Sequence, residues 1–477
     1  MTGHRLVGTT LRQRTAAAVS DERLRANVAR AVDRFAGHRL TGLAELDHEP
    51  AAPGEPGGAD GLRRAARAVK QQVLADLPDL LERFADRVLA RGGHVCWAST
   101  AADARRYIVE VVEAAGATRV AKSKSMATEE IDLNPALQAA GKEVVETDLG
   151  EWIIQLAGET PSHIIAPALH RDRHQIRDLF VDTAAAPPGL GTEPAELVRF
   201  ARGRLREVFL AAEVGITGAN IAVAETGSIV LVTNEGNGRL VTALPRVHVA
   251  VLGMERLAAD WAQADLLLAL LARSATGQRL SSYTSVVTSA RAAGEADGPD
   301  ELHVVILDNG RSDLLAGEHH EMLGCIRCGA CLNVCPVYRQ TGGHAYGWVY
   351  PGPMGAVLTP LLAGEEHPEA AEVAGASTLC GACMDACPVQ IPLQDLLLSL
   401  RRARAVDAGR AERAAWRAWS AAWSDARRYG ATTRAATWGR WAAGLAGHLP
   451  TGRGWATGRT VPRPAAERFR DRWRAGS

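Results

Sequence analysis

The 477-residue sequence has no apolar run of the length that a membrane-spanning helix needs. Such a helix takes about 18 or more consecutive apolar residues, and the longest candidate, around Leu266–Leu271, is far shorter. Met1–Leu11 likewise lacks an apolar core of signal-peptide length. We therefore expect a cytoplasmic chain, in a reducing compartment where disulfides are rare.

The sequence also lacks the glycine-rich fingerprint of dinucleotide-binding proteins. No G-x-G-x-x-G follows a predicted strand, and Gly189-Leu190-Gly191 lies in a proline-rich stretch. This absence argues against a nucleotide hydride carrier on this chain.

Cysteine is scarce but concentrated, because seven of the eight cysteines lie in two runs. The runs read Cys325-x2-Cys328-x2-Cys331-x3-Cys335-Pro336 and Cys380-x2-Cys383-x3-Cys387-Pro388. Three thiolates in a tight turn can converge on one iron-sulfur cubane, while a fourth, followed by proline, points to a second cluster. The pattern therefore indicates a protein that passes electrons. The eighth cysteine, Cys96, is expected in a buried strand.

The crossed pattern assigns Cys325, Cys328, Cys331 and Cys387 to one cluster, and Cys335, Cys380 and Cys383 to the other. The second set is one cysteine short. Ser377 stands where Cys325 stands in the first run, so the fourth ligand is the Ser377 hydroxyl, a water molecule or nothing. An incomplete site could hold a three-iron form or an oxygen-ligated iron, and oxygen ligation would alter the cluster's potential.

Structural zinc is the main alternative for these cysteines, and the spacing disfavours it. Zinc sites usually use paired two-cysteine knuckles, whereas one run here offers four cysteines and both runs end in Cys-Pro. Disulfides are disfavoured because nothing else in the sequence suggests secretion.

Helix and strand signals alternate before the cysteine runs. Strands are predicted at His94–Ala98, Thr118–Ala121, Val144–Thr147, His163–Ala166, Asn220–Ala224, Ile229–Thr233, Val247–Leu252 and His303–Leu307. Helices are predicted at Arg63–Arg91, Ala101–Ala115, Thr128–Ala140, Pro194–Val214 and Met254–Ala272. The alternation predicts an α/β layer with a largely parallel sheet.

The chain is long enough for several domains. We predict an N-terminal helical arm and linker at 1–60, an α/β domain at 61–312, a helical dicluster ferredoxin-like domain at 313–400 and a helical region at 401–477. Within the arm, Asp21–Ala36 is a predicted helix and Gly54–Gly61 the predicted linker.

The C-terminal region is strongly basic, although the whole chain has a formal net charge of zero. Residues 401–477 hold seventeen arginines, no lysine and five acidic residues, and seven of the eleven tryptophans. Trp416, Trp419 and Trp423 share one helical face. Such a surface can pack on its own protein, dock on an acidic partner or lie on an anionic membrane. Nucleic acid is not expected, because no reading motif accompanies the arginines.

Five motifs occur in the order that is found in the lactate utilisation protein B family, which the sequence resembles: Lys122–Met126, Glu146–Glu151, Pro161–Ile164, Glu225–Ser228 and Cys325–Tyr338. The resemblance runs from about residue 20 to about residue 400, with a weaker continuation. It implies a CoA-transferase-like or isomerase-like α/β domain of the LUD type, then a helical ferredoxin-type domain whose second run also has three cysteines. It further implies that the chain acts with two partner proteins in the oxidation of L-lactate to pyruvate.

Lactate oxidation removes two electrons and a hydride equivalent, whereas a cluster accepts one electron at a time. A two-electron acceptor such as a flavin is therefore needed, and we expect it in a partner. The chain is then an electron-transfer subunit, in the cytoplasm or peripheral on the inner face of the membrane. Two rivals remain open: a subunit of a glycolate-oxidase-like or heterodisulfide-reductase-like complex, and an α/β binding or transferase protein with structural or sensing clusters.

The α/β domain offers candidate groups for a carboxylate substrate. Lys122, Lys124 and the segment Glu225–Ser228 could supply cations and free N–H donors, and His163 and His170 are candidate proton acceptors. Each has a structural alternative. Loop lysines are often solvated, Thr-Gly-Ser between two apolar runs suits a hairpin turn, and a histidine at a strand start is often structural.

Overall fold

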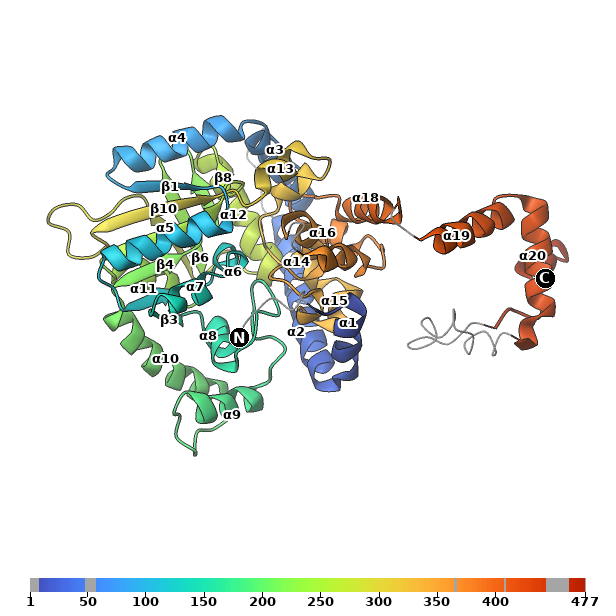
Figure 1. Cartoon of the computed structure of the whole chain (residues 1–477), viewed down its shortest axis with the longest axis horizontal. Coiled ribbons are helices and arrows are strands. Elements are labelled where there is room, and N and C mark those ends of the chain that lie inside the picture. Colours follow the sequence, from blue (N-terminus) through green and yellow to red (C-terminus); the bar gives the residue numbers. More distant parts are fainter. Residues whose placement is uncertain (1–7, 48–56, 364–366, 407–408, 443–462, 477) are drawn as a thin grey trace. The chain divides into compact units, whose positions relative to one another are not determined.

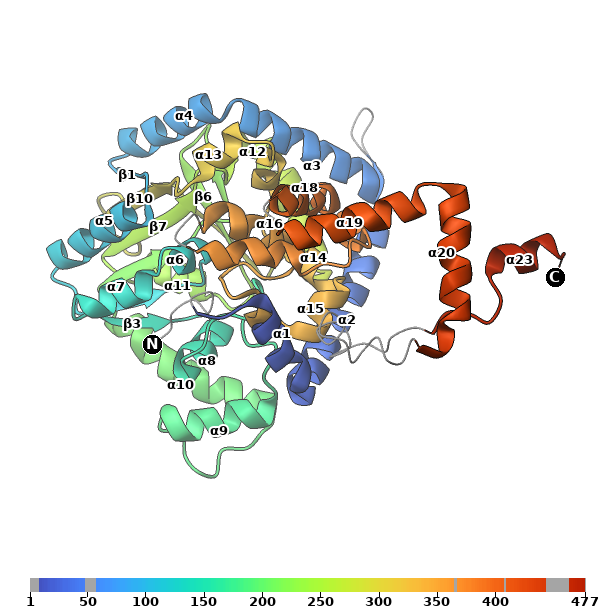
Figure 2. The same ribbon diagram turned by 45° about the vertical axis from the view of Figure 1, so that its right-hand side comes forward.

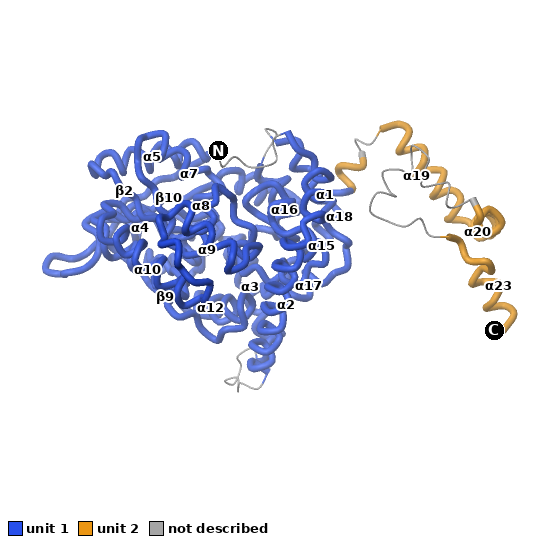
Figure 3. Tube along the Cα trace, turned by 90° about the horizontal axis from the view of Figure 1, so that it is seen from below, with its two compact units in different colours: residues 1–401 blue, residues 402–477 orange. Residues whose placement is uncertain are grey.

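The structure, a computed structural model, describes residues 8–47, 57–363, 367–406, 409–442 and 463–476. Contacts divide the chain into two compact units, residues 1–401 and 402–477 (Figure 3). In the described part of the chain, every helix is too short or too polar to cross a bilayer. The predicted linker Gly54–Gly61 lies partly outside the described residues, and α3 already begins at Gly58.

A six-stranded parallel sheet forms the centre of the first unit (Figure 1). Its strand order is β1 (His94–Ala98), β10 (Glu301–Leu307), β7 (Val247–Gly253), β4 (Val214–Thr217), β2 (Arg119–Lys122) and β3 (Glu143–Glu146). Every residue of β7 is buried, as expected for a parallel strand covered on both faces.

Two helical layers cover this sheet because successive side chains of a strand point to opposite faces. On one face, Val249 and Val251 pack with α5 (Ala101–Ala114) and α7 (Leu133–Ala139). On the other face, Ala250 and Leu252 pack with α4 (Leu77–Ala90). The register of the apolar residues thus determines which helix each strand residue meets.

Local sequence explains where α5 begins and which side it buries. Thr100 and Asp103 form a reciprocal capping box at its N-terminus, which satisfies backbone N–H groups that have no helical partner. Ala104, Ile108 and Val112 follow at intervals of four residues and are fully buried. The cap and the apolar stripe together orient α5 along the sheet.

A second, four-stranded sheet lies beside the first. Its order is β8 (Leu257–Ala258), β5 (Ile221–Val223), β6 (Ser228–Thr233) and β9 (Tyr283–Val287). The pairs β5–β6 and β6–β9 are antiparallel, and β5–β8 is parallel. The helices α3 (Gly58–Ala75) and α12 (Trp261–Thr276) contact β8.

The remaining helices of the α/β part lie between these strands or, for α13, after the last of them. They are α6 (Met126–Glu130), α8 (Leu149–Ala157), α9 (Arg173–Thr183), α10 (Pro194–Ala211), α11 (Asn237–Ala243) and α13 (Arg311–Ala316).

The cysteine runs lie in a module of short helices and loops. Its helices are α14 (Ala330–Asn333), α15 (Pro336–Thr341), α16 (Gly352–Leu362), α17 (Ala382–Ala386) and α18 (Leu393–Val406). The N-terminal helices are α1 (Leu11–Ser20) and α2 (Glu22–Ala44), and α2 contacts α12, α14 and α15 (Figure 2). The N-terminal arm therefore joins the α/β part to the cysteine module.

The second unit contains α19 (Arg410–Trp423), α20 (Ala426–Trp438) and α23 (Phe469–Arg474). The rings of Trp416, Trp419 and Trp423 form a continuous stripe, with centroid separations of 5.8 and 5.6 Å. Their exposed fractions are 61%, 52% and 49%, so the stripe is half open. Another tryptophan of this region, Trp455, lies outside the described residues.

The predicted fold class is confirmed: a parallel-rich sheet, a helical cysteine module and a helical C-terminal region. Several element predictions were wrong in detail, and three of them lie near the candidate sites. His163–Ala166 is a loop, because the N–H groups of Ile165 and Ala166 bond to His163 Nδ1 rather than to a strand. The predicted helix Met254–Ala272 begins only at Trp261, after the short strand β8. The predicted helix Thr128–Ala140 is split near Asp132, whose φ is 49°.

Candidate functional site

Four cysteines from both runs line one small cavity. Cys325, Cys328 and Cys331 reach it from the segment around the start of α14, and Cys387 from the end of α17. Gly329 makes the tight turn, with φ of 77°, and a Cβ there would lie 3.1 Å from His163 Cε1. The turn thus requires glycine both for its left-handed backbone and for the close approach of His163.

The other three cysteines line a second cavity together with Ser377. Cys335 comes from the start of α15, and Cys380 and Cys383 from the start of α17. Cys380 is exposed, whereas Cys335 and Cys383 are buried. The structure therefore brings together the same residues that the crossed pattern groups.

The loops Cys325–Cys328 and Ser377–Cys380 share one backbone feature. Arg327 and Leu379, each just before a cysteine, have φ of 60° and 56°, uncommon values for residues other than glycine. The Arg327 N–H donates to Cys325 Sγ at 3.5 Å, and the Leu379 N–H donates to Ser377 Oγ at 3.1 Å. The Ser377 hydroxyl thus takes the place that the Cys325 thiol takes in the first loop.

The donor set fits iron-sulfur clusters better than a single zinc ion. Four thiolates around zinc lie only about 3.8 Å apart, given Zn–S bonds of about 2.3 Å. Among the described residues, which include all eight cysteines, no three of these sulfur atoms lie within 4.8 Å of one another. The sulfur atoms in each group are therefore spread more widely than a single zinc ion requires.

Burial favours the neutral thiol at a cysteine of each group. It raises the pKa of Cys387 to about 11, and the pKa of Cys383 to about 12 with a further contribution from the charge of Cys335. Thiolate ligation requires these protons to leave, and bound iron supplies the compensating positive charge. The buried thiols are therefore suited to metal binding rather than to exchange chemistry in solvent.

Arginines from distant parts of the chain surround the first group. Arg39 donates to the Ala386 carbonyl at 3.0 Å, and Arg63 donates to the Cys387 carbonyl at 3.0 Å. Arg256 donates to the Cys325 carbonyl at 3.1 Å. Sequence reasoning missed all three, because nothing in their local sequence links them to the cysteine runs.

A larger cavity of about 250 Å³ lies at the carboxyl ends of β2, β4 and β7. β2 and β4 are neighbours in the sheet. After β2 the chain continues to β3 on one side of this pair, and after β4 it continues towards β7 on the other side. Such a point of divergence is where parallel sheets commonly bind ligands. Arg327 and Tyr350 of the cysteine module form part of the wall, so the cavity adjoins the first cysteine group.

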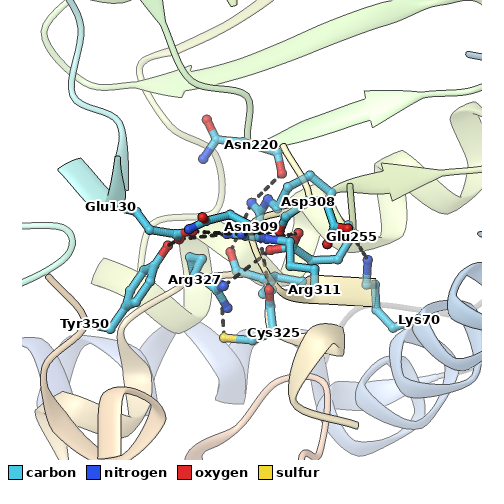
Figure 4. A network of polar contacts seen from close by, with 12 residues as sticks. Lys70, Glu130, Asn220, Glu255, Asp308, Asn309, Arg311, Cys325, Arg327 and Tyr350 are labelled. Atoms are coloured by element: carbon cyan, nitrogen blue, oxygen red, sulfur yellow. Dashed lines mark hydrogen bonds and ion pairs between the residues drawn. The ribbon is translucent and has the colours of Figure 1, made fainter. Parts of the chain in front are cut away.

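A buried polar network supports this wall (Figure 4). Arg311 bonds to Glu130 through both Nη atoms at 2.8 and 2.7 Å and to Glu255 at 2.8 Å. Glu255 also pairs with Arg327 at 3.3 Å, and Tyr350 donates to Glu130 at 2.6 Å. Burial opposes ionisation of Glu255, but the guanidinium groups of Arg311 and Arg327 outweigh it and lower its pKa to about 2.

The two predicted lysines have different surroundings. Lys122 is buried, with its Nζ 2.7 Å from Glu146 and 3.0 Å from Glu129. Burial opposes its charge, but those carboxylates dominate and raise its pKa. Lys124 lines the large cavity and donates to the Ile165 carbonyl at 3.0 Å.

The two candidate histidines make structural contacts. His163 is fully buried beside the first cysteine loop, with its Nε2 3.1 Å from Asn333 Oδ1, and burial lowers its pKa to about 3. His170 Nε2 lies 2.8 Å from Glu159.

Glu225 is exposed at the β5–β6 turn. In that turn, Gly227 lies against Arg87 and Val88 of α4. The turn is at the opposite ends of β5 and β6 from the cavity, which is lined by Asn220 before β5 and by residues at the end of β6.

Comparison with known proteins identifies three regions. A model described as the LUD domain matches residues 81–307, one described as the 4Fe-4S dicluster domain matches 321–391, and one described as Lactate utilisation protein B, C-terminal, matches 400–476.

Full-length relatives extend the similarity over most of the chain. Lactate utilization protein B of Shouchella clausii is 49% identical over 429 residues, which cover 88% of this chain and 89% of that protein. The Bacillus subtilis protein of the same name is 46% identical, covering 85% and 82%. An uncharacterized electron transport protein, YkgF of Escherichia coli, is 48% identical, covering 81% and 78%. The chain therefore belongs to the lactate utilisation protein B family and contains an iron-sulfur dicluster domain.

Proposed function

We propose that this chain is the electron-transfer subunit of a multi-protein complex that oxidises L-lactate to pyruvate. The observation that carries the proposal is the gathering of seven cysteines from two distant runs into two neighbouring groups. Cys325, Cys328, Cys331 and Cys387 would hold one 4Fe-4S cluster. Cys335, Cys380 and Cys383, with Ser377, would hold the other. When bound, these clusters supply one-electron carriers.

The exposure of the two groups supports a direction for the relay. The first group adjoins the cavity of the α/β part, and three of its four cysteines are buried. The second group reaches the surface at Cys380, where a redox partner can approach. The two-electron step requires a hydride acceptor, which we assign to a flavin in one of two partner proteins.

The function is tested by purifying the chain anaerobically with its partners and adding L-lactate. We expect electron paramagnetic resonance to show reduced clusters, because lactate is the electron donor in this proposal. Glycolate and a dithiol are the comparison substrates. Reduction by either of these, with no response to L-lactate, would support a different redox complex. Clusters that cannot be cycled by dithionite and oxidant would support a structural or sensing role.

Ser377 provides a test of the second ligand set. Ser377→Cys is expected to give four thiolates and to change the potential and resonance spectrum of one cluster only, because ligand type sets the potential. Ser377→Ala should lose iron from that cluster or convert it to a three-iron form, while Ser377→Thr keeps the hydroxyl and the wild-type spectrum. Identical spectra for the alanine and wild-type proteins would show that Ser377 is not a ligand.

The tryptophan stripe on α19 is proposed as the docking surface for an acidic partner subunit. Replacing Trp416, Trp419 and Trp423 by alanine should reduce recovery of partners by about tenfold or more, because buried tryptophans often dominate interface energy. Trp97, exposed on β1, is the matched control, and Trp97→Ala should leave recovery unchanged. If the triple variant still recovers its partners but no longer floats with anionic phosphatidylglycerol vesicles, the stripe is instead a membrane-contact surface.

A further inference from the structure

The cavity at the carboxyl ends of β2 and β4 has the size of a small-molecule site. Its volume of about 250 Å³ falls just below the range of about 300–1,000 Å³ typical of drug-sized ligands. Ser123 and Lys124 follow β2, and Asn220 follows β4, so the wall carries polar groups from both diverging loops. A small polar molecule fits this position better than a nucleotide.

Positive charge is in excess at the end of the cavity nearest the cysteines. Arg256, Arg311 and Arg327 face only two carboxylates, those of Glu130 and Glu255. Arg311 forms ion pairs with both carboxylates. Arg327 pairs only with Glu255, which it shares with Arg311. The three guanidinium groups therefore outnumber the two carboxylates by one. The buried Lys70 amine beside Glu255 adds positive charge, and a Cys325 thiolate beside Arg327 offsets one charge.

Two details indicate that this positive charge is suited to binding a ligand. Arg256 donates hydrogen bonds to the carbonyl groups of Cys325 and Asn220, neither of which carries a charge. Arg327 has an Nη1 without a hydrogen-bond partner among the described residues. Guanidinium groups in such surroundings favour a planar, bidentate anion.

We propose that this cavity binds a small carboxylate, such as a 2-hydroxy or 2-oxo acid, against Arg256 and Arg327. The choice of L-lactate and pyruvate as ligands rests on the proposed function, whereas the site itself rests on the cavity and its charges. Arg327 lies inside the Cys325–Cys328 loop, so a bound anion adds negative charge beside the first cysteine group. By linkage, reduction of a cluster there weakens binding of the anion, and the anion lowers the cluster's potential.

The test is calorimetric titration of the anaerobic full-length protein with L-lactate and with pyruvate, and needs no electron transfer. Wild-type protein should bind at least one of them saturably, and more weakly after reduction by dithionite. Arg327→Asn should weaken binding by about tenfold or more, because one charge-assisted contact is lost. Asparagine tolerates the left-handed backbone at this position. Arg327→Lys keeps the charge without the planar fork and should bind with intermediate affinity.

Leu379→Asn is the matched control, since Leu379 has the same backbone conformation in the second loop and does not line this cavity. Iron content is measured for every variant. Equal affinity in Arg327→Asn and wild type, or tighter binding of inorganic phosphate than of either acid, would overturn the inference. A protein that binds the acids while its complex shows no lactate-dependent reduction would keep this inference and lose the proposed function. Lactate-dependent reduction of the complex, with no binding of either acid by the protein, would keep the proposed function and overturn this inference.

Discussion

Replacing Cys328 by alanine is expected to remove about half of the bound iron, from about eight to about four atoms per chain, because one 4Fe-4S cluster loses a ligand. Cys328 is buried in the first group, where no other cysteine of the described chain is free to replace it. L-lactate should then no longer reduce either cluster in the assembled complex. The second cluster should persist, because its ligands come from the other group.

The measurements are iron and sulfide content and the resonance spectrum after addition of L-lactate. Cys96→Ala is the matched control, because Cys96 lies on β1 and lines neither cysteine cavity. The Cys96→Ala protein should retain the wild-type iron content and the wild-type spectral response to L-lactate. A Cys328→Ala protein with wild-type iron content would refute the ligand assignment. One that loses both clusters would show that the two groups fold as a single unit.

Replacing Arg311 by methionine is expected to lower the free energy of unfolding by about 3–5 kcal/mol, the cost typical of breaking a buried ion pair. The side chains of Arg311, Glu130 and Glu255 are 1%, 0% and 2% exposed, so neither carboxylate can recover its lost partner from water. Arg311→Lys keeps the charge but not the three directed hydrogen bonds. Its free energy of unfolding should therefore lie between that of the wild type and that of Arg311→Met. Thermal unfolding followed by circular dichroism measures the series.

The pH dependence provides an internal check on this network. The pKa of Glu255 is lowered from 4.5 to about 2 in the folded chain. Its contribution to stability is therefore present above about pH 4.5 and is lost as the pH falls towards 2. Because Arg311→Met removes a major source of this shift, the stability difference between the variant and the wild type should shrink on acidification. A constant difference across this range would contradict the proposed role of the ion pairs.

Local sequence accounts for several helix and strand boundaries that the prediction misplaced. The predicted helix Arg63–Arg91 is two helices, α3 and α4, with a break at Asp76. Pro78 accounts for the break, because proline has no N–H to donate and is accommodated only in the first turn of a helix. Strand β4 was missed because it has only four residues and follows α10 almost directly.

Lys122 and Lys124 show why the candidate site was harder to predict. They are two residues apart at the end of β2, and either could have faced a ligand on sequence grounds. Glu146, on the neighbouring strand β3, captures Lys122 in the interior, while Lys124 lies at the cavity. Strand pairing decides which of the two lysines lines the cavity, and strand pairing is not encoded in the motif itself.

The amino-acid sequence by itself determined the chemistry of the cysteines, the alternation of helix and strand and the family resemblance, because each depends on spacing along the chain. Only the tertiary structure decided which groups lie around the ligand sites. Arg39, Arg63 and Arg256 surround the first cysteine group although they lie far from it in sequence. Their positions follow from helix packing and from the order of strands in the sheet, which bring distant residues together through contacts that short-range patterns do not record.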